Sequence, residues 1–344
     1  MNENSRQALI ATDLHLRPQH IEAGKLLLSK ILAEVKIHQP RYLFLLGDIF
    51  HYKDRLFASC LSVFSDFLEE VTKECEVICL VGNHDWGIPY TVHSLDSFRH
   101  MPNFTIVDDF YKLDENNGFI SYCREPERFE EMKKNVGPVK RLYGHLDIND
   151  FKVGSGWEEV NAYSSAEDFV GYEQVFSGHL HLEQEKTLEN GTKIVFIGTG
   201  YTTDFGETDQ KKRFLLLDID TGEYSSIDTG MTLHKTLRIK AGDPFPVIPE
   251  EETLRGVEYR VIVSGTKEQL ALVQRPKGNY VARIVYEFQA QDAVRIDLSV
   301  TDTRQETLSK YIDHEVEKSF GGDQSGLDKD KLKKLGESIL NKYS

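Results

Sequence analysis

The 344-residue sequence has few cysteines, no long apolar run and no recognisable export signal. Its four cysteines, Cys60, Cys75, Cys79 and Cys123, include no CxxC pair, and so few thiols favour reduced side chains over a disulfide framework. No apolar run approaches the roughly 18 residues that a membrane span needs. The polar start, Met1–Ser5, lacks the basic-then-apolar layout of a signal peptide. These absences predict a cytoplasmic protein with no membrane association.

Basic residues are too few to balance the acidic ones. Lys and Arg total 41 and Asp and Glu total 56, so the formal net charge is -15. This balance argues against a free-standing nucleic-acid binder, which usually carries a basic domain. Bound cations would weaken the objection, because metal ions attract phosphate locally whatever the net charge. A second chain that carries a DNA-binding surface would weaken it too.

The first 85 residues alternate between strand and helix patterns. The apolar runs Ala8–Ala11, Arg41–Leu46 and Val77–Val81 predict buried strands, while apolar residues at helical spacing predict helices over about Ile21–Ile37 and Phe57–Thr72. Near-continuous apolar strands joined by helices predict an α/β fold whose sheet is parallel and covered on both faces. In such sheets, binding sites form beyond the carboxyl ends of the strands.

The rest of the chain is less regular and changes composition near residue 235. Strand patterns resume between residues 193 and 227, and a second region has strands over Glu258–Ser264 and Tyr280–Phe288 around a helix at Lys267–Val273. Two amphipathic helices flank the break at Gly321–Gly326. We therefore predict one large domain over residues 1–235, a small α/β domain over 236–302 and C-terminal helices over 303–344.

Ligand-type side chains gather in five short motifs, each at the predicted end of a strand: Asp13-Leu14-His15, Gly47-Asp48, Gly82-Asn83-His84-Asp85, Gly144-His145 and Gly178-His179-Leu180-His181. Carboxylate, amide and imidazole groups together suit Mn²⁺, Fe or Zn²⁺ in an open catalytic site. Two such ions, about 4 Å apart, can polarise a phosphoryl group, generate hydroxide and steady the attacking and leaving oxygens. Each motif alone is more often an ordinary turn or core pair, but the five in order predict a two-metal phosphoesterase.

These motifs resemble the calcineurin-like metallophosphoesterase superfamily over about residues 8 to 220. The resemblance implies a layered fold of β-sheets flanked by helices, and two metal ions bridged by Asp48. The ligands of one ion would be Asp13, His15, Asp48 and His181. The ligands of the other would be Asp48, Asn83, His145 and His179. His84 matches the family's catalytic histidine, which protonates the leaving oxygen or stabilises the transition state, and Asp85 would orient it.

The residues after Asp48 favour one branch of this superfamily. Its protein phosphatases carry GDxxDRG, whereas here His51 stands where the second aspartate should be. The string Gly47-Asp48-Ile49-Phe50-His51 resembles the SbcD-type nucleases of double-strand-break repair, in which the matching histidine assists phosphate positioning. The segments Ile197–Tyr201 and Asp204–Glu207 resemble the close of that branch's phosphoesterase domain, although Thr199-Gly200 replaces the more usual serine-proline.

This second resemblance implies DNA cleavage, as exonuclease and endonuclease, in DNA repair, recombination or replication. Mn²⁺ is the expected metal, with Mg²⁺, Fe or Zn²⁺ as alternatives. Residues 236–302 would form the capping domain, and the helices of 303–344 would dock on the coiled-coil base of an SbcC-type ATPase or, alternatively, pack on their own core. The expected assembly is a homodimer within a heterotetramer. The compact length suggests a bacteriophage-type version, in the bacterial or phage-infected cytoplasm.

Two alternatives remain open from the residues themselves. A metallophosphatase or cyclic-nucleotide phosphodiesterase would use the same metals on small phosphoesters. A scaffold that has kept the fold and lost catalysis is disfavoured by the complete ligand set, because drift would be expected to erase at least one ligand.

Overall fold

The computed structural model describes residues 6–53, 55–87, 91–152, 162–208, 210–254, 256–274, 282–288, 312 and 331–334. The chain divides into two compact units, Met1–Ser264 with Leu272–Glu287 and Gly265–Ala271 with Phe288–Ser344. The first unit carries all five predicted ligand motifs. No helix among the described residues is long and apolar enough to cross a membrane.

The first unit contains a six-stranded sheet in the order β12-β11-β1-β2-β3-β4. Its strands are β1 (Gln7–Ala11), β2 (Tyr42–Leu45), β3 (Glu76–Leu80), β4 (Phe104–Val107), β11 (Arg213–Asp218) and β12 (Tyr224–Asp228). Strands β1 to β4 are parallel, as predicted for the first three, and β11 and β12 add an antiparallel edge beside β1. The carboxyl ends of β1, β2 and β3 therefore lie side by side.

A second six-stranded sheet has the order β5-β6-β7-β8-β10-β9. Its strands are β5 (Phe110–Lys112), β6 (Asn117–Ile120), β7 (Arg141–His145), β8 (Gln174–Gly178), β9 (Gln184–Thr187) and β10 (Lys193–Phe196). The four central strands are parallel, and β5 and β9 form antiparallel edges. The predicted strands before the Gly144-His145 and Gly178-His179 motifs and from residue 193 correspond to β7, β8 and β10, whereas the order of the whole sheet was not predicted.

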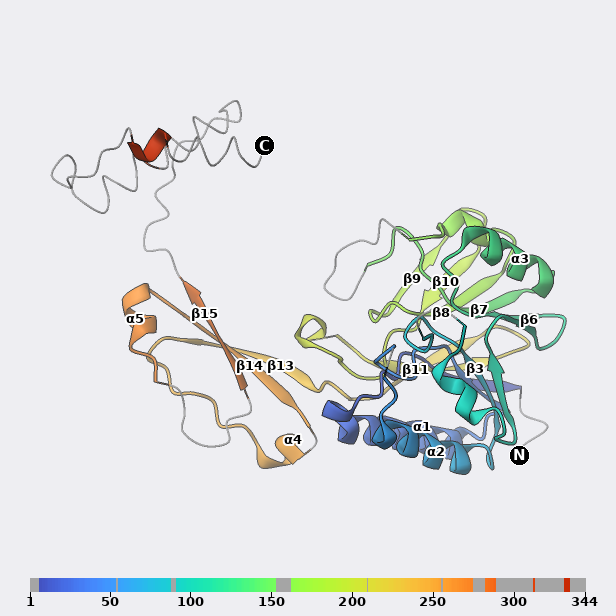
Figure 1. Ribbon diagram of the computed structural model, residues 1–344, viewed down its shortest axis with the longest axis horizontal. Helices are drawn as coiled ribbons and strands as arrows, with labels where there is room; N and C mark the ends of the chain where they lie inside the picture. Colours follow the sequence, from blue (N-terminus) through green and yellow to red (C-terminus); the bar gives the residue numbers. More distant parts are fainter. Residues whose placement is uncertain are drawn as a thin grey trace. The chain divides into compact units, whose positions relative to one another are not determined.

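Helices cover the outer faces of both sheets (Figure 1). The helices are α1 (Ile21–His38), α2 (Ala58–Val71) and α3 (Pro126–Val136), with 3₁₀ turns η1 (Pro18–His20), η2 (Ser94–Phe98), η3 (Ala166–Phe169) and η4 (Phe205–Glu207). Helix α1 ends where Gln39 takes a left-handed conformation and its N–H bonds to the Val35 carbonyl, immediately before Pro40. The apolar stripes of α1 and α2 pack on the first sheet, and α3 packs on the second.

The inner faces of the two sheets meet in an apolar layer rich in aromatic rings. The rings of Phe119 and Tyr143 stack with centroids 4.7 Å apart, Tyr143 stacks on Phe176 at 5.6 Å, and Phe44 meets Phe119 edge-on at 4.9 Å. Such pairs contribute about 0.5–1.5 kcal/mol each beyond the burial of their area. The architecture is thus helix, sheet, sheet, helix, which confirms the predicted layered α/β fold. The first sheet is covered by helices on one face and by the second sheet on the other.

A third sheet follows along the chain, in the order β13-β14-β15. Its strands are β13 (His234–Lys240), β14 (Glu258–Gly265) and β15 (Ala282–Phe288), with α4 (Glu250–Leu254) between the first two. Helix α5 (Lys267–Ala271) belongs to the second unit. The predicted strands and helix of this region are confirmed. The division at residues 235 and 302 stays a prediction, and the predicted terminal helices lie outside the described residues except for 312 and 331–334.

Candidate metal centre

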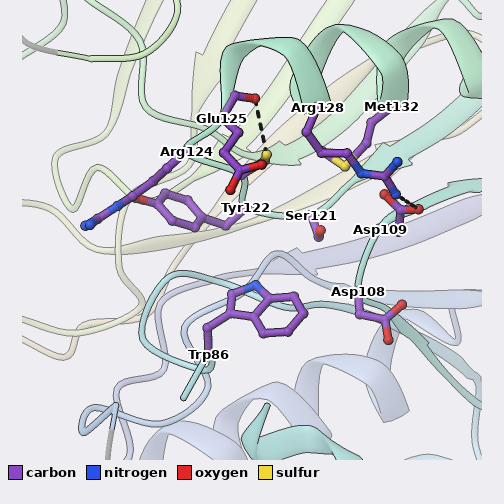
Figure 2. Close-up of a pocket in the computed structure, with 10 residues that line it drawn as sticks. Trp86, Asp108, Asp109, Ser121, Tyr122, Arg124, Glu125, Arg128 and Met132 are labelled. Atoms are coloured by element: carbon purple, nitrogen blue, oxygen red, sulfur yellow. Dashed lines mark hydrogen bonds and ion pairs between the residues drawn. The ribbon is translucent and has the colours of Figure 1, made fainter. Parts of the chain in front are cut away.

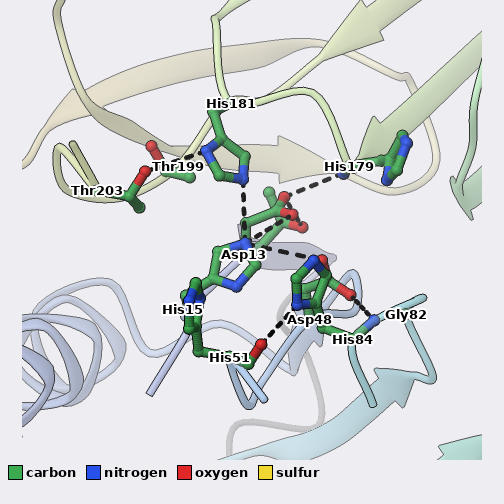
Figure 3. Close-up of polar contacts among 12 residues, drawn as sticks. Asp13, His15, Asp48, His51, Gly82, His84, His179, His181, Thr199 and Thr203 are labelled. Carbon is green, nitrogen blue, oxygen red and sulfur yellow. Dashed lines mark hydrogen bonds and ion pairs between the residues drawn. The ribbon is translucent and has the colours of Figure 1, made fainter. Parts of the chain in front are cut away.

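The seven predicted metal ligands converge at the carboxyl ends of strands from both sheets. Figure 3 shows Asp13, His15, Asp48, His179 and His181 among them. Asp13 and His15 follow β1, Asp48 follows β2, and Asn83 follows β3, all in the first sheet. The second sheet supplies the rest: His145 is the last residue of β7, and His179 and His181 follow β8. The site therefore spans the seam between the two layers.

One group of ligand atoms surrounds the Nε2 atom of His15. This atom lies 3.0 Å from Nε2 of His181, 3.7 Å from Oδ2 of Asp48 and 3.9 Å from Oδ1 of Asp13. The other Asp13 oxygen, Oδ2, accepts the Thr12 hydroxyl and the His179 backbone N–H. Oδ1 is buried and finds no hydrogen-bond partner among the described residues. An unsatisfied buried carboxylate oxygen is costly, so a cation coordinated there fits this donor set.

A second group of ligand atoms surrounds Nε2 of His145. That atom lies 2.9 Å from Oδ1 of Asn83 and 3.4 Å from Oδ1 of Asp48, and Nδ1 of His179 lies 3.0 Å from the same Asn83 oxygen. Asp48 thus turns one oxygen toward each group, as a bridging carboxylate would. The predicted ligands thus lie in two neighbouring groups, and ligand atoms of Asp13, Asp48 and His145 also lie within 4.8 Å of one another. Their hard oxygen and imidazole donors suit divalent cations.

Several ligands sit in backbone conformations that are rare outside glycine. The φ angles are 53° at Asp13, 43° at His15, 54° at Asp48 and 82° at His179. These are four of the seven non-glycine residues with positive φ in the described part of the chain. Such conformations cost of order 1–3 kcal/mol each and persist where surrounding structure enforces them. The turns after β1, β2 and β8 are therefore strained, which is common at functional sites.

Two glycines allow the strand ends to approach each other. A Cβ atom at Gly82 would lie 2.3 Å from the Asp48 backbone nitrogen and from its Oδ1. A Cβ atom at Gly178 would lie 2.1 Å from the Thr12 hydroxyl oxygen. Any side chain at either position would push apart the loops that carry the ligands, so the glycines of the GNHD and GHLH motifs serve close packing.

Burial keeps two of the ligand histidines, His15 and His179, in the form that binds metals. For a third, His145, burial is outweighed by the charge of Asp48, which raises the pKa of His145 to about 9. Burial lowers the pKa of His15 well below its usual value, and burial together with the charge of His145 lowers the pKa of His179 to about 3. Both rings are therefore neutral at pH 7, which is the form that binds metals. Burial alone would raise the pKa of Asp48, but the charge and hydrogen bond of His145 outweigh it and hold that pKa well below its usual range.

His84 is oriented by the backbone of His51. Its Nδ1 lies 2.6 Å from the His51 carbonyl oxygen, so the Nδ1–H donates there and Nε2 stays available to a substrate. The backbone N–H of His84 donates to Oδ1 of Asp48, at 2.8 Å. The rings of His51 and His84 stack with centroids 5.7 Å apart, and the His15 ring meets the His84 ring edge-on at 4.9 Å. The predicted catalytic pair thus borders the first group of ligands (Figure 3).

Asp85 does not have the orienting role that the resemblance implied. Its carboxylate accepts backbone N–H groups from Gly82, Phe50 and Ile49, at 3.0, 3.1 and 3.2 Å. None of its hydrogen bonds within the described part of the chain reaches the His84 ring. Burial, followed by the charge of Asp48, raises its pKa to about 7. Asp85 instead ties the loop after β2 to the loop after β3, and is a positioning residue.

Sequence reasoning missed a buried ion pair behind His181. Nδ1 of His181 lies 2.7 Å from Oε1 of Glu207, and Oε2 of Glu207 lies 2.8 Å from Nζ of Lys212. Burial would raise the pKa of Glu207, but the His181 hydrogen bond and the Lys212 charge outweigh it and lower that pKa. The ionised carboxylate holds the proton of His181 on Nδ1, which directs the Nε2 lone pair toward His15 and Asp13. Carboxylate partners of this kind orient metal-binding histidines.

Lys212 also links this pair to the turn before it. Its Nζ donates to the Thr199 hydroxyl at 2.6 Å and to the His181 carbonyl at 3.2 Å. The Thr203 hydroxyl donates to Oε1 of Glu207, at 2.6 Å. Thr199, which stands where serine is more usual, thus keeps a hydroxyl that the buried lysine uses. Glu207 lay in a segment singled out by resemblance, but no sequence signal pointed to Lys212.

The fold and the site together define a metal-dependent phosphoesterase. A family model described as calcineurin-like phosphoesterase matches residues 7–183, just over half of the chain. The chain therefore belongs to the calcineurin-like phosphoesterase family, and it is a metal-dependent phosphoester hydrolase. The matched residues include every predicted ligand, from Asp13 to His181.

The more specific similarities are to viral proteins. A candidate phosphoesterase, 244L of Invertebrate iridescent virus 6, is 26% identical over 248 residues, which cover 67% of this chain and 84% of that protein. Exonuclease subunit 1 of Enterobacteria phage T4 is 23% identical over 239 residues, which cover 65% of each chain. Among solved structures, TT1561 of Thermus thermophilus aligns with a TM-score of 0.43 and 13% identity, over 66% of this chain and 100% of that one.

Replacing Glu207 with Gln should weaken Mn²⁺ binding to the metal-free protein by about 10- to 100-fold, because His181 loses the charged partner that orients it. Isothermal titration calorimetry measures the affinity. The double variant Glu207→Gln/Lys212→Met should keep the weakened affinity while recovering thermal stability, since it leaves no unpaired charge buried. Glu185→Gln is the matched control, because it breaks a part-exposed pair with Lys193. Unchanged affinity in folded Glu207→Gln protein would contradict the orienting role.

Proposed function

We propose that the chain is the nuclease subunit of a DNA-processing enzyme, with exonuclease and endonuclease activity in repair, recombination or replication. The proposal rests on the contact of His51 with His84 beside the ligand groups. The phosphatase motif would have an aspartate at the position of His51. A second imidazole at that position adds a neutral hydrogen-bonding group for a phosphodiester. The T4 relative, which is named an exonuclease subunit, supports the same substrate.

The chain's own residues would position the phosphodiester and its leaving group. When bound, two divalent cations, with Mn²⁺ expected, would supply charge neutralisation and Lewis-acid polarisation of the phosphoryl group. Asp13, His15, Asp48 and His181 would hold one cation, and Asp48, Asn83, His145 and His179 the other. The His51 carbonyl keeps the His84 proton on Nδ1 in the neutral ring. His84 would then meet the leaving oxygen through Nε2, as a protonated donor or as a hydrogen-bonding group.

We also propose that the chain works with an SbcC-type coiled-coil ATPase, as a homodimer within a heterotetramer. The net charge of -15 supports a partner that helps to hold DNA, because an acidic chain attracts the polyanion poorly. The T4 relative is named a subunit, which agrees with an assembly of several chains. The proposed docking segment, residues 303–344, lies outside the described residues except for 312 and 331–334.

The purified full chain should cleave end-labelled duplex and single-stranded DNA when Mn²⁺ is added, and EDTA should abolish the cleavage. Denaturing gels report the products, and a parallel panel contains a phosphomonoester and a cyclic nucleotide at the same concentration. Fast turnover of either small phosphoester with intact DNA would identify a phosphatase or cyclic-nucleotide phosphodiesterase instead. No turnover of any substrate, with metals bound, would favour a scaffold that has lost catalysis.

His84→Ala should lower kcat for DNA cleavage by about 10²- to 10⁴-fold, which is the range for losing a general acid. Its Mn²⁺ affinity, measured by calorimetry, should stay close to that of the wild-type chain, because His84 is outside both ligand groups. His100→Ala is the matched control, since His100 is exposed and lies after η2. Full activity in His84→Ala protein would remove His84 from the mechanism.

Co-expression with an SbcC-type ATPase from the same genome should yield a stable complex with two copies of each chain. Size-exclusion chromatography with light scattering measures its mass. A chain shortened after residue 302 should cleave DNA alone but fail to co-elute with the ATPase. Co-elution of the shortened chain at full yield would show that the docking surface lies elsewhere.

A further inference from the structure

A cavity of about 520 Å³ lies beside the metal centre (Figure 2). Its volume falls within the roughly 300–1,000 Å³ of small-molecule sites. The Trp86 ring forms one side, and Tyr122, Arg124 and Arg128 lie opposite (Figure 2). None of the predicted ligands or catalytic residues lines this cavity, which we call the Trp86 pocket, so it is a site additional to the metal centre.

The Trp86 pocket and the metal centre share their walls. The Tyr122 ring is 5.8 Å from the His179 ring and 6.0 Å from the His145 ring, measured between centroids. Trp86 belongs to the loop after β3 that carries Asn83 and His84. A group bound in the pocket would therefore stand next to a phosphate bound at the metal centre.

The backbone and the ring of Trp86 are held in place by contacts with residues 92–94. The Trp86 ring meets the His93 ring edge-on, with centroids 5.2 Å apart. The Gly87 N–H donates to the Val92 carbonyl at 2.9 Å, and the Ser94 N–H donates to the Asp85 carbonyl at 2.8 Å. These contacts preorganise the indole as a rigid platform, which lowers the entropy lost on binding a flat ligand.

The charges of the pocket balance closely enough to disfavour an anion. Arg128 is paired with Asp109, and Asp108 is paired with Arg99 from outside the pocket. Nε of Arg124 donates to the Tyr122 hydroxyl, at 2.6 Å. The lining thus offers an aromatic face together with both donors and acceptors and no excess positive charge. A flat, neutral group with a polar edge, such as a nucleobase, matches this chemistry better than a second phosphate.

We propose that the Trp86 pocket binds an unpaired nucleobase of the strand being cut, adjacent to the scissile phosphate. The proposal rests on the proposed action on DNA and narrows its substrate. A base inside a duplex is stacked and cannot enter the pocket, so the enzyme acts on single strands, frayed ends or a base turned out of the helix. Stacking on an aromatic side chain is worth about 1–3 kcal/mol per base.

Cleavage of single-stranded oligonucleotides with one abasic nucleotide, placed in turn on each side of a defined cut, tests the pocket. In the wild-type chain, the missing base on one side should lower kcat/KM by about 5- to 150-fold, which is the stacking energy expressed as a ratio. Trp86→Ala should lower kcat/KM on the intact oligonucleotide similarly and should no longer distinguish the abasic substrate. Hydrolysis of bis(p-nitrophenyl) phosphate, which has no base, should change less than twofold.

Two further variants test whether misfolding, rather than loss of base binding, explains any loss of activity. Trp86→Phe keeps an aromatic face and should retain most of the activity and the discrimination. Phe110→Ala removes a part-exposed ring outside the pocket and should behave as wild type. If Trp86→Ala remains folded and cleaves intact and abasic DNA as the wild-type chain does, the pocket proposal is overturned while the nuclease function stands.

Tryptophan fluorescence measures base binding in the pocket independently of DNA cleavage. In a Trp157→Phe chain Trp86 is the sole tryptophan. A short single-stranded oligonucleotide, added without metal, should quench its emission, whereas inorganic phosphate and a fully abasic oligonucleotide should not. Quenching without any DNA cleavage would support base binding and reject the nuclease function. Equal quenching by the abasic oligonucleotide would reject base binding.

Discussion

The buried carboxylate of Asp48 is the group on which the rest of the site depends. One oxygen faces His15, and the other lies near His145 and accepts the backbone N–H of His84. With its side chain only 3% exposed, Asp48 would be strongly destabilising without partners of opposite charge or hydrogen-bond donors. It therefore couples both ligand groups and the catalytic histidine, because each supplies part of what a buried anion requires.

The strained backbone conformations of the site lie in loops, and packing between the two sheets holds these loops in place. Asp13, His15, Asp48 and His179 occupy left-handed backbone conformations at strand ends. The aromatic layer between the sheets and the close contacts at Gly82 and Gly178 hold those ends together. These contacts fix the ligand-bearing loops in place, and such preorganisation reduces the reorganisation needed during catalysis.

The loop after β3 carries residues of both the metal centre and the Trp86 pocket. Within four residues it carries the ligand Asn83, the catalytic His84, the anchor Asp85 and the aromatic Trp86. Asp85 bonds this loop to the residues beside His51, whose carbonyl in turn orients His84. Because these contacts fix the loop backbone, they hold the ligand, the catalytic histidine and the pocket wall in a constant arrangement.

The sequence by itself pointed to the candidate ligands and to most strands of the first sheet. Metal chemistry restricts the residue types, and apolar runs mark β1, β2 and β3, so Asp13, Asp48 and Asn83 could be placed at strand ends. In the second sheet, apolar runs marked β7, β8 and β10, but β5, β6 and β9 are too short to show a clear period. The Glu207–Lys212 pair, the loop-anchoring role of Asp85 and the Trp86 pocket were decided only by tertiary structure. Each depends on which segments come together in the folded chain, and local residue patterns do not encode those contacts.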